Sequence, residues 1–571
     1  MLKRIAALAI IPLILTVLGY GAQKLTLYSW NQVVEYQSPY TVPLPLSSEG
    51  QPVADQVVIV VVDGLRLDAS REMPTLNRLR AQGADLVAIT GEPSLSLPGW
   101  TVIASGAYQE ISGVTTNWYE GAVKVDHIFA AAKRKGLTTA IVGGPDWGQL
   151  FGPQVDYSHY IKGAADERDV PAVRRADKEI LDVSLAILRE QKPNLFLIHF
   201  HGPDSIGHGY GGASPEYRED AQHIDRLLAQ LVEAVDLNSA VLLVTADHGQ
   251  IDTGGHGGWE PVVKRVPLII AGKGIVSGAT YGQVGQGAIA STVAVLLGTS
   301  IPTHSQDGAL LGLIEEPAQA RGQQELAVAQ QLATFYDGYA RQVGAAPFGQ
   351  ELLASAKGDL LAGDLAAYTS FVQEITQRAR AARAARLGRE RLGRLPLALA
   401  VAIVPALYVV FHRRKREWLL PLVGAAFYFV IYNGLFFGRG LQWSLSVYNT
   451  EAQIETFFTQ RAMDAMLAIV IAALVVGLLS RGRTRYEAAK MVVNTSFLVG
   501  YLLLLQIALF YWLYDVRFSW YIPDLKIGFK YYLDLLQMMA TSFPQKIPLA
   551  FILPFLGLGA QWVAQRVPVG R

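Results

Sequence analysis

The apolar residues of this 571-residue chain are gathered into a few long runs, and this constrains its fold more than any other feature. One run extends from Ile5 to about Gly21, directly after two basic residues. The further runs follow Arg394: Leu395–Phe411, Trp418–Phe437, Ala462–Leu479, Met491–Tyr514 and Ile547–Ala564. Each approaches the roughly 20 residues that cross a bilayer, and a water-soluble helical domain cannot bury so many such segments. The sequence therefore predicts an all-α polytopic membrane domain with about five transmembrane helices over residues 395–571.

The basic residues of the loops orient these spans. They cluster beside the N-terminal run, at Arg413–Arg416, at Arg481–Lys490 and near the C-terminus, all on one side if every run crosses. The positive-inside rule then predicts a multi-pass protein of the cell membrane with both termini in the cytoplasm and residues 23–394 outside it. Residues 1–22 are predicted to be a retained signal anchor, with a cleaved signal peptide as the alternative. The amphipathic segment 524–539 is expected to lie on the outer leaflet.

The part of the chain outside the cytoplasm is predicted to contain an α/β domain. Short β-branched apolar runs alternate there with helical stretches. The clearest strand candidates are Val57–Val62, Thr138–Val142, Leu195–His199 and Ala240–Thr245. We assign this domain to residues 23–316 and a helical connector to residues 317–394. The arginines from Arg378 to Arg394 give the connector a basic tract, which is either a solvated helix face or a contact with anionic head groups.

The composition excludes several classes of function. The chain has 49 basic and 48 acidic residues, a formal net charge of +1, so nothing indicates nucleic acid as a partner. It has no cysteine, which excludes disulfides, thiolate metal sites and cysteine nucleophiles.

Acidic residues and histidines follow three of the predicted strands, where open α/β sheets place their sites. These residues are Asp63, Asp204, His208, Asp247, His248 and His256. Taken singly, an aspartate here is as well explained by a helix N-cap, and a histidine by packing. Together, three aspartates and three histidines are about the number of oxygen and nitrogen ligands that two divalent metal ions need.

A candidate nucleophile lies between the first and second of these strands. The segment from Pro93 to Gly106 has the pattern of a helix that starts after a proline. A hydroxyl at such a start meets oriented backbone N–H groups and the positive end of the helix dipole, which suits a phosphate. Ser94 and Ser96 are both plausible on this ground, and either can instead be a simple cap.

Five motifs in order resemble the alkaline phosphatase superfamily, most closely its type I phosphodiesterase/nucleotide pyrophosphatase branch. They are Val-Val-Asp63-Gly64, the segment from Pro93 through Ser96 and Pro98 to Gly106, Pro203-Asp204 to His208, Thr-Ala-Asp247-His248-Gly249, and Gly255-His256-Gly257. The resemblance implies an alkaline-phosphatase-like fold, with a mixed, mostly parallel sheet flanked by helices. It also implies two bound divalent ions, most plausibly Zn²⁺.

The same resemblance assigns roles to individual residues. Asp63, Ser96, Asp247 and His248 match the ligands of one zinc, and Asp204, His208 and His256 match those of the other. Ser96 matches the nucleophile, and Asn117 falls where the branch has an asparagine that binds a phosphoryl oxygen. Trp100 departs from the branch, and we interpret it as a change in the pocket and not in the metal site. Trp100, Trp118 and Trp259 are expected to line an apolar substrate pocket, although a core role is as plausible for each.

The main functional prediction is a membrane-bound two-metal phosphoric ester hydrolase or phosphodiesterase that forms a covalent phospho-Ser96 intermediate. The alternative is a transferase that moves a phospho-alcohol group to a lipid or glycolipid, because the overall layout resembles the ethanolamine phosphate transferases of glycolipid anchor assembly. A non-catalytic membrane binding or transport protein is a third, weaker hypothesis. The predicted partners are a phosphate ester, which the membrane domain suggests is lipid-linked, and the bilayer itself.

Overall fold

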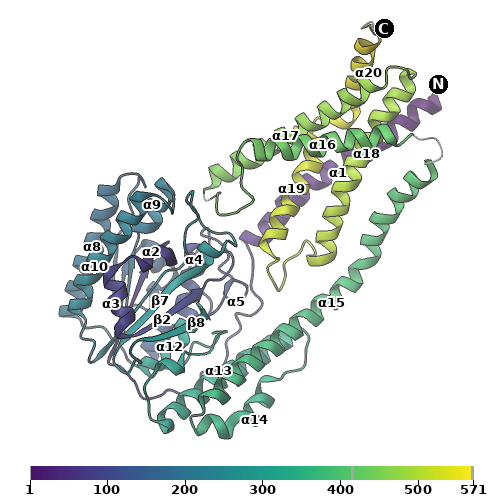
Figure 1. Cartoon of the computed structure of the whole chain (residues 1–571). Coiled ribbons are helices and arrows are strands. Elements are labelled where there is room, and N and C mark those ends of the chain that lie inside the picture. Colours follow the sequence, from purple (N-terminus) through teal and green to yellow (C-terminus); the bar gives the residue numbers. More distant parts are fainter. Residues whose placement is uncertain (1, 413–416, 449, 567–571) are drawn as a thin grey trace.

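The computed structural model describes residues 2–412, 417–448 and 450–566, and the basic cluster Arg413–Arg416 lies outside the described residues. The structure has an α/β part and an elongated bundle of helices, joined by the long helix α15 (Leu365–His412) (Figure 1). This separation follows the division of the sequence into a mixed region and an apolar one.

The α/β part is built on one eight-stranded sheet of order β4-β3-β5-β1-β6-β7-β2-β8. The strands are β1 (Gln56–Val62), β2 (Ala84–Ile89), β3 (Thr139–Gly143), β4 (Tyr157–Tyr160), β5 (Leu195–Phe200), β6 (Ala240–Thr245), β7 (Arg265–Gly272) and β8 (Ala279–Gly285). Only β7 runs antiparallel to its neighbours, so the mixed, mostly parallel sheet is confirmed. The four predicted strands are β1, β3, β5 and β6, and their apolar runs are buried because helices cover both faces.

The helices of the α/β part fall into two groups. On one side α12 packs against α4 and α6, and on the other α10 packs against α3, α8 and α9 (Figure 1). The helices of this part are α2 (Leu67–Arg71), α3 (Pro74–Gln82), α4 (Ser96–Ser105), α5 (Gln109–Ser112), α6 (Ile128–Arg134), α7 (Pro145–Phe151), α8 (Val170–Glu190), α9 (Gly202–Tyr210), α10 (Pro215–Ala234), α11 (Pro261–Lys264) and α12 (Ala288–Leu297).

The connector is helical, and its last helix is continuous with the first apolar run after it. Helices α13 (Ala318–Gln342) and α14 (Gly349–Leu361) pack together and against α15. Helix α15 contains both the basic tract and the predicted span 395–411, although Pro396 and Pro405 lie inside it. No helix boundary therefore separates connector from span.

The basic tract from Arg378 to Arg394 was expected to be either a solvated helix face or a contact with anionic head groups, and neither expectation describes the contacts that it makes. Most of its arginines bind groups of the protein itself. Arg383 pairs with the partly buried Glu110 of the α/β part. Arg386 lies 4.2 Å from the ring centre of Trp520, and Arg394 donates to the carbonyl oxygen of Trp512 at 3.2 Å. The tract thus fastens α15 to the α/β part, to the end of α18 and to the loop that follows it.

The bundle consists of α1 (Leu2–Val34), α16 (Leu419–Gly438), α17 (Glu451–Leu479), α18 (Arg485–Tyr514), α19 (Leu525–Ser542) and α20 (Leu549–Arg566). Among the described residues, five helices including α15 are long and apolar enough to cross a membrane, and α19 with α20 forms a pair bent by 89° that counts as a sixth. Helix α1 continues to Val34, beyond the expected end of the anchor at residue 22.

Helix α19 differs from the expectation that residues 524–539 lie on the outer leaflet. It packs against α1, α17 and α18 inside the bundle (Figure 1). Its amphipathic pattern serves this packing, because Tyr531, Leu535 and Met538 are buried against neighbouring helices. Its charged pair Lys530 and Asp534 is joined side chain to side chain, so the charges do not need an aqueous surface.

Candidate functional site

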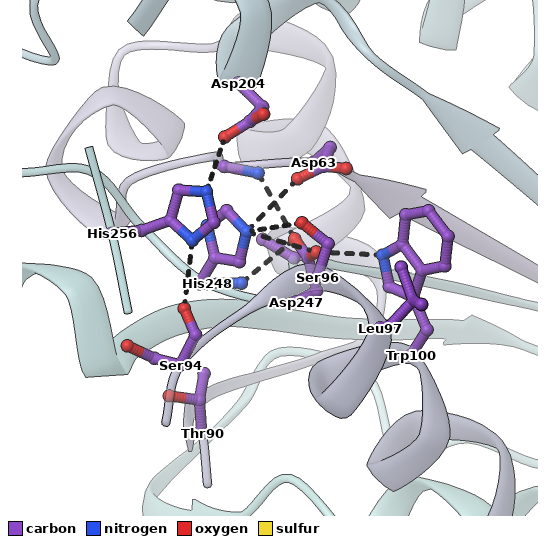
Figure 2. A network of polar contacts seen from close by, with 12 residues as sticks. Asp63, Thr90, Ser94, Ser96, Leu97, Trp100, Asp204, Asp247, His248 and His256 are labelled. Atoms are coloured by element: carbon purple, nitrogen blue, oxygen red, sulfur yellow. Dashed lines mark hydrogen bonds and ion pairs between the residues drawn. The ribbon is translucent and has the colours of Figure 1, made fainter. Parts of the chain in front are cut away.

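The candidate site lies at the carboxyl ends of three adjacent strands. Strand β1 is paired with β5 on one side and β6 on the other, all parallel. Asp63 follows β1, Asp204 lies in the first turn of α9 after β5, and Asp247 follows β6. The sheet order therefore brings together three acidic residues that are distant in sequence (Figure 2).

Two overlapping groups of ligand-type side chains result. Asp63, Asp247 and His248 offer atoms within 4.8 Å of one another, as do Asp204, His248 and His256. The rings of His248 and His256 are stacked, with their centres 3.6 Å apart. His208 joins the second group, because its Nε2 lies 3.4 Å from Oδ2 of Asp204.

The structure distinguishes the two candidate serines. Ser96 is the first residue of α4, and its Oγ lies 3.2 Å from Nε2 of His248. The hydroxyl of Ser94 instead donates to the carbonyl oxygen of Gly258 at 2.8 Å, while its own carbonyl oxygen lies 3.1 Å from Nδ1 of His256. Ser96 thus faces the cluster, and Ser94 supports the loop that carries His256 (Figure 2).

Asn117 is held beside the same helix start. Its Oδ1 accepts a hydrogen bond of 3.0 Å from the backbone N–H of Leu97. Because that oxygen is used, the amide NH₂ group, which can only donate, remains for a ligand. Such a donor next to Ser96 suits a negatively charged oxygen.

The electrostatics of the site fit cations. Burial, together with the charges of Asp247 and Asp204, holds the pKa of Asp63 well above its usual range. Burial lowers the pKa of His248 to about 4 and that of His256 to about 3, so both imidazoles are neutral, the form that binds metals. Oδ1 of Asp63 accepts no hydrogen bond from the described residues. Three crowded carboxylates and neutral imidazoles form a nitrogen and oxygen donor set that suits two divalent ions.

Several residues that support this cluster were missed by the sequence analysis. Nε2 of His199 lies 2.9 Å from Oδ2 of Asp63, and Nε2 of Gln250 donates to Oδ1 of Asp204 at 2.6 Å. Gly64 has a φ of +66°, and a Cβ there would lie 2.8 Å from Cα of Asp204. His199 lies inside the apolar run of β5, where a histidine is hard to distinguish from a core residue. What identifies His199 is its position on β5 opposite the end of β1, and this position is known only once the order of the strands in the sheet is known.

The interpretation of Trp100 as a pocket residue needs correction. Its indole is buried, and Nε1 donates to Oδ2 of Asp247 at 2.9 Å. Trp100 therefore belongs to the acidic cluster, because an indole N–H on an α4 side chain reaches the carboxylate that follows β6. Trp118, in contrast, is 45% exposed and lines a pocket beside the cluster. The ring of Trp259 packs 6.3 Å from that of Phe529, a lining residue of the same pocket.

This pocket has a volume of about 260 Å³ and lies between the cluster and the bundle. Asn117 and His256 are among its lining residues. Most of the wall is apolar, and part of it comes from α1, α17 and α19; the lining residues from these helices are Trp30, Val33, Ile454, Phe457, Phe458, Leu525 and Phe529. The site is thus connected to helices of membrane-spanning composition by an apolar path.

A loop of the bundle also holds the segment that carries His256. Oγ of Ser446, in the loop between α16 and α17, accepts a hydrogen bond of 2.9 Å from the backbone N–H of Gly258. The same hydroxyl donates to Oε2 of Glu260 at 2.7 Å. The bundle is therefore in direct contact with the loop that carries His256.

Comparison with known proteins tests the family resemblance inferred from the motifs. Residues 57–266 match the family model described as type I phosphodiesterase / nucleotide pyrophosphatase. The match covers the strands and loops that carry Asp63, Ser96, Asp204, Asp247 and His256, and it confirms the resemblance inferred from the motifs.

Relatives of known name are similar over the same region. GPI ethanolamine phosphate transferase 1 of Emericella nidulans is 26% identical over 384 residues, which are 56% of this chain and 40% of the relative. The enzyme of the same name from Mus musculus is 26% identical over 50% of this chain and 35% of its own length. That from Yarrowia lipolytica is 29% identical over 40% of this chain and 28% of its own length. The matched regions thus span about a third of the relatives.

Solved structures with similar coordinates include murine ectonucleotide pyrophosphatase/phosphodiesterase 5, with a TM-score of 0.38, 14% identity, and coverage of 45% of this chain and 98% of the other. A variant of alkaline phosphatase PafA has a TM-score of 0.41 and 12% identity, and covers 46% of this chain and 100% of its own.

Proposed function

We propose that this protein is a membrane-bound transferase that moves a phospho-alcohol group, of the phosphoethanolamine type, from a phosphodiester donor to a hydroxyl group of a lipid or glycolipid. The hydrolase predicted from the motifs would use the same site residues and differ only in its acceptor. The names of the relatives favour the transferase over the hydrolase.

The apolar pocket is the observation that carries this proposal. A hydrolase of soluble phosphate esters has no need of an apolar path between its nucleophile and a membrane bundle. A phosphodiester with one lipid arm does, because burying that arm against Ile454, Phe457 and Phe529 gains about 25 cal/mol per Å² of apolar surface removed from water. The phosphate of such a substrate would then lie beside Asn117 and Ser96.

The roles of the side chains follow from their positions. Two divalent ions, zinc by the resemblance, would be held by Asp63, Asp204, Asp247 and the histidines near them, and would supply positive charge to the phosphate oxygens. Oγ of Ser96 would attack phosphorus, so that the Oγ–P bond forms while the bond to the donor alcohol breaks and that alcohol takes up a proton. Asn117 and the N–H groups at the start of α4 would donate to a non-bridging oxygen as its charge grows.

In the second half of the reaction an acceptor hydroxyl would attack the same phosphorus. Its oxygen would form the new P–O bond, the bond to Ser96 would break, and the acceptor proton would end on the serine. With water in place of the acceptor, the same steps give hydrolysis, so the two functions differ in what reaches the site.

We also propose that the α/β part lies outside the cytoplasm and that both termini lie inside. The loop charges support this orientation. A reporter fused after residue 250 should be active outside the cytoplasm, and activity inside would contradict it.

Acceptor dependence tests the proposed reaction. The full-length protein in nanodiscs, supplied with zinc, would be given a chromogenic phosphodiester with and without a lipid alcohol. We expect chromophore release to require the lipid alcohol and to yield a phosphorylated lipid. Release in water that the lipid alcohol does not change would instead support the hydrolase.

A further inference from the structure

A second cavity, polar in character, also borders the candidate metal cluster. Its volume is about 390 Å³, and His208 forms part of its wall. The ring centres of His208 and His256 are 5.1 Å apart. His256 lines the apolar pocket, so each cavity borders one histidine of the cluster. They meet at Thr450, which lines both.

The wall of the polar cavity comes from both parts of the protein. Glu167, Thr253 and Gly254 come from loops of the α/β part, and Gln442 and Val447 come from the bundle loop between α16 and α17. Of the described residues that line it, none is a lysine or an arginine. Apart from the imidazole of His208, the one ionisable side chain there is the carboxylate of Glu167.

A phosphodiester bound at the cluster has two ester arms. The mostly apolar pocket suits a lipid-like arm, so the other arm would leave the phosphate elsewhere. The polar cavity offers that arm hydroxyl and amide groups and a negative charge, next to a region where cations would already neutralise the phosphate. The wall has no lysine or arginine among its described residues, and the imidazole of His208 would be neutral as a metal ligand, so the carboxylate of Glu167 attracts a positively charged group.

We infer that the polar cavity binds the alcohol arm of the donor and that Glu167 selects a donor whose arm ends in an ammonium group. This inference rests on the proposed function and adds to it the residue that reads the charge of the transferred group. Glu167 is assigned as a specificity-determining residue; the nucleophile and the cluster are separate from it.

The experiment compares two lipids that differ only in this charge. Full-length protein with zinc and a lipid alcohol acceptor would be given vesicles of dioleoyl phosphatidylethanolamine or of dioleoyl phosphatidylpropanol, whose head group has a methyl group in place of the ammonium. The measured quantity is kcat/KM for release of dioleoylglycerol. We expect the natural protein to prefer the ammonium lipid by about tenfold or more, the value of a hydrogen bond to a charged group.

In Glu167→Gln, kcat/KM for phosphatidylethanolamine should fall to about the value for phosphatidylpropanol, and the latter should not change. Asp166→Asn is the matched control, because it removes a neighbouring charge that does not line the cavity, and it should keep the preference. An unchanged preference in Glu167→Gln, or an equal loss with both lipids, overturns the inference while leaving the transferase intact. If the natural protein releases dioleoylglycerol from neither lipid, the proposed function fails, and the inference fails with it.

Discussion

The indole N–H of Trp100 donates a 2.9 Å hydrogen bond to Oδ2 of Asp247, and the ring stacks on Trp147 with the ring centres 4.8 Å apart. This bond fixes Oδ2 of Asp247, which is a candidate metal ligand. Oδ1 of the same carboxylate accepts from the backbone N–H groups of Gly64 and His248. Asp247 is therefore held on both oxygens before any cation binds.

We predict that Trp100→Phe weakens metal binding, because it removes this donor and keeps an aromatic ring in the stack. Loss of such a supporting bond typically costs 10- to 100-fold in metal affinity or activity. Activity titrated against free zinc, with the bound metal measured in parallel, checks this. Trp147→Phe is the control, since Nε1 of Trp147 has no hydrogen-bond partner among the described residues. Equal zinc curves for the two variants would rule out this role for Trp100.

Replacing Ser96 by alanine should abolish turnover, by at least about 10³-fold, because the nucleophile is lost while the carboxylates and imidazoles remain. Metal content measured by elemental analysis should stay close to that of the natural protein. Ser94→Ala loses only the hydrogen bond to Gly258 and should retain activity within about tenfold. Full activity of Ser96→Ala would remove the nucleophile assignment.

The sequence predicted the parts of this site that depend on strand ends. Asp63, Asp204 and Asp247 each follow an apolar run, and parallel strands that neighbour one another must bring such residues together. The position of each aspartate after its own apolar run was sufficient to identify it. The pattern of a helix start left Ser94 and Ser96 both open, and only the family resemblance selected Ser96, which is the first residue of α4.

Contacts between distant segments were not predictable in this way. Trp100 looked like a pocket residue because nothing local shows that its indole reaches Asp247. The amphipathic pattern of α19 fits a bilayer surface and a bundle equally well, and only its neighbours decide between them. The change in composition after Arg394 suggested a boundary between connector and span, yet α15 continues through it.

The hydrogen bond from Gly258 to Ser446 predicts that the bundle contributes to catalysis. Ser446→Ala should lower kcat by about tenfold with little change in KM, because the loop of His256 loses an acceptor worth about 1 kcal/mol and Glu260 loses a donor. Tyr40→Phe is the matched control, since Tyr40 also joins the α/β part to the bundle side, through the carbonyl oxygen of Trp520, at a distance from His256. Its kcat should be unchanged. Similar kcat values for both variants would contradict a positioning role for Ser446.

A pair of buried carboxyl groups makes stability depend on pH. A Cβ on Gly202 would lie 2.3 Å from Oδ2 of Asp220 and 2.5 Å from Oδ2 of Asp177, so the two groups converge. Burial raises the pKa of Asp220 from 3.8 to about 6. Between these values the folded state binds more protons than the unfolded state, so stability falls as the pH rises from about 4 to about 6.

Asp220→Asn has no such group to ionise, and its stability should fall less over that window. The difference in thermal midpoint between the variant and the natural protein should therefore shift in favour of the variant from pH 4 to pH 6 and then level off. Tryptophan fluorescence during heating in detergent, at intervals of half a pH unit, measures both midpoints. Parallel curves for the two proteins would show that Asp220 ionises with an ordinary pKa.

Filling the apolar pocket should separate lipid substrates from soluble ones. Ile454 on α17 lines the pocket of about 260 Å³, and Ile454→Trp would occupy part of that space without touching Ser96 or the carboxylates. Because a longer acyl arm needs more of the pocket, kcat/KM should fall about tenfold or more with a dioleoyl donor and stay nearly constant with a soluble chromogenic phosphodiester. Leu467→Trp, on an exposed face of the same helix, controls for the added indole. A parallel loss with both substrates would mean that the pocket supports the site without holding the lipid arm, and the transferase would then need another route from the bilayer to Ser96.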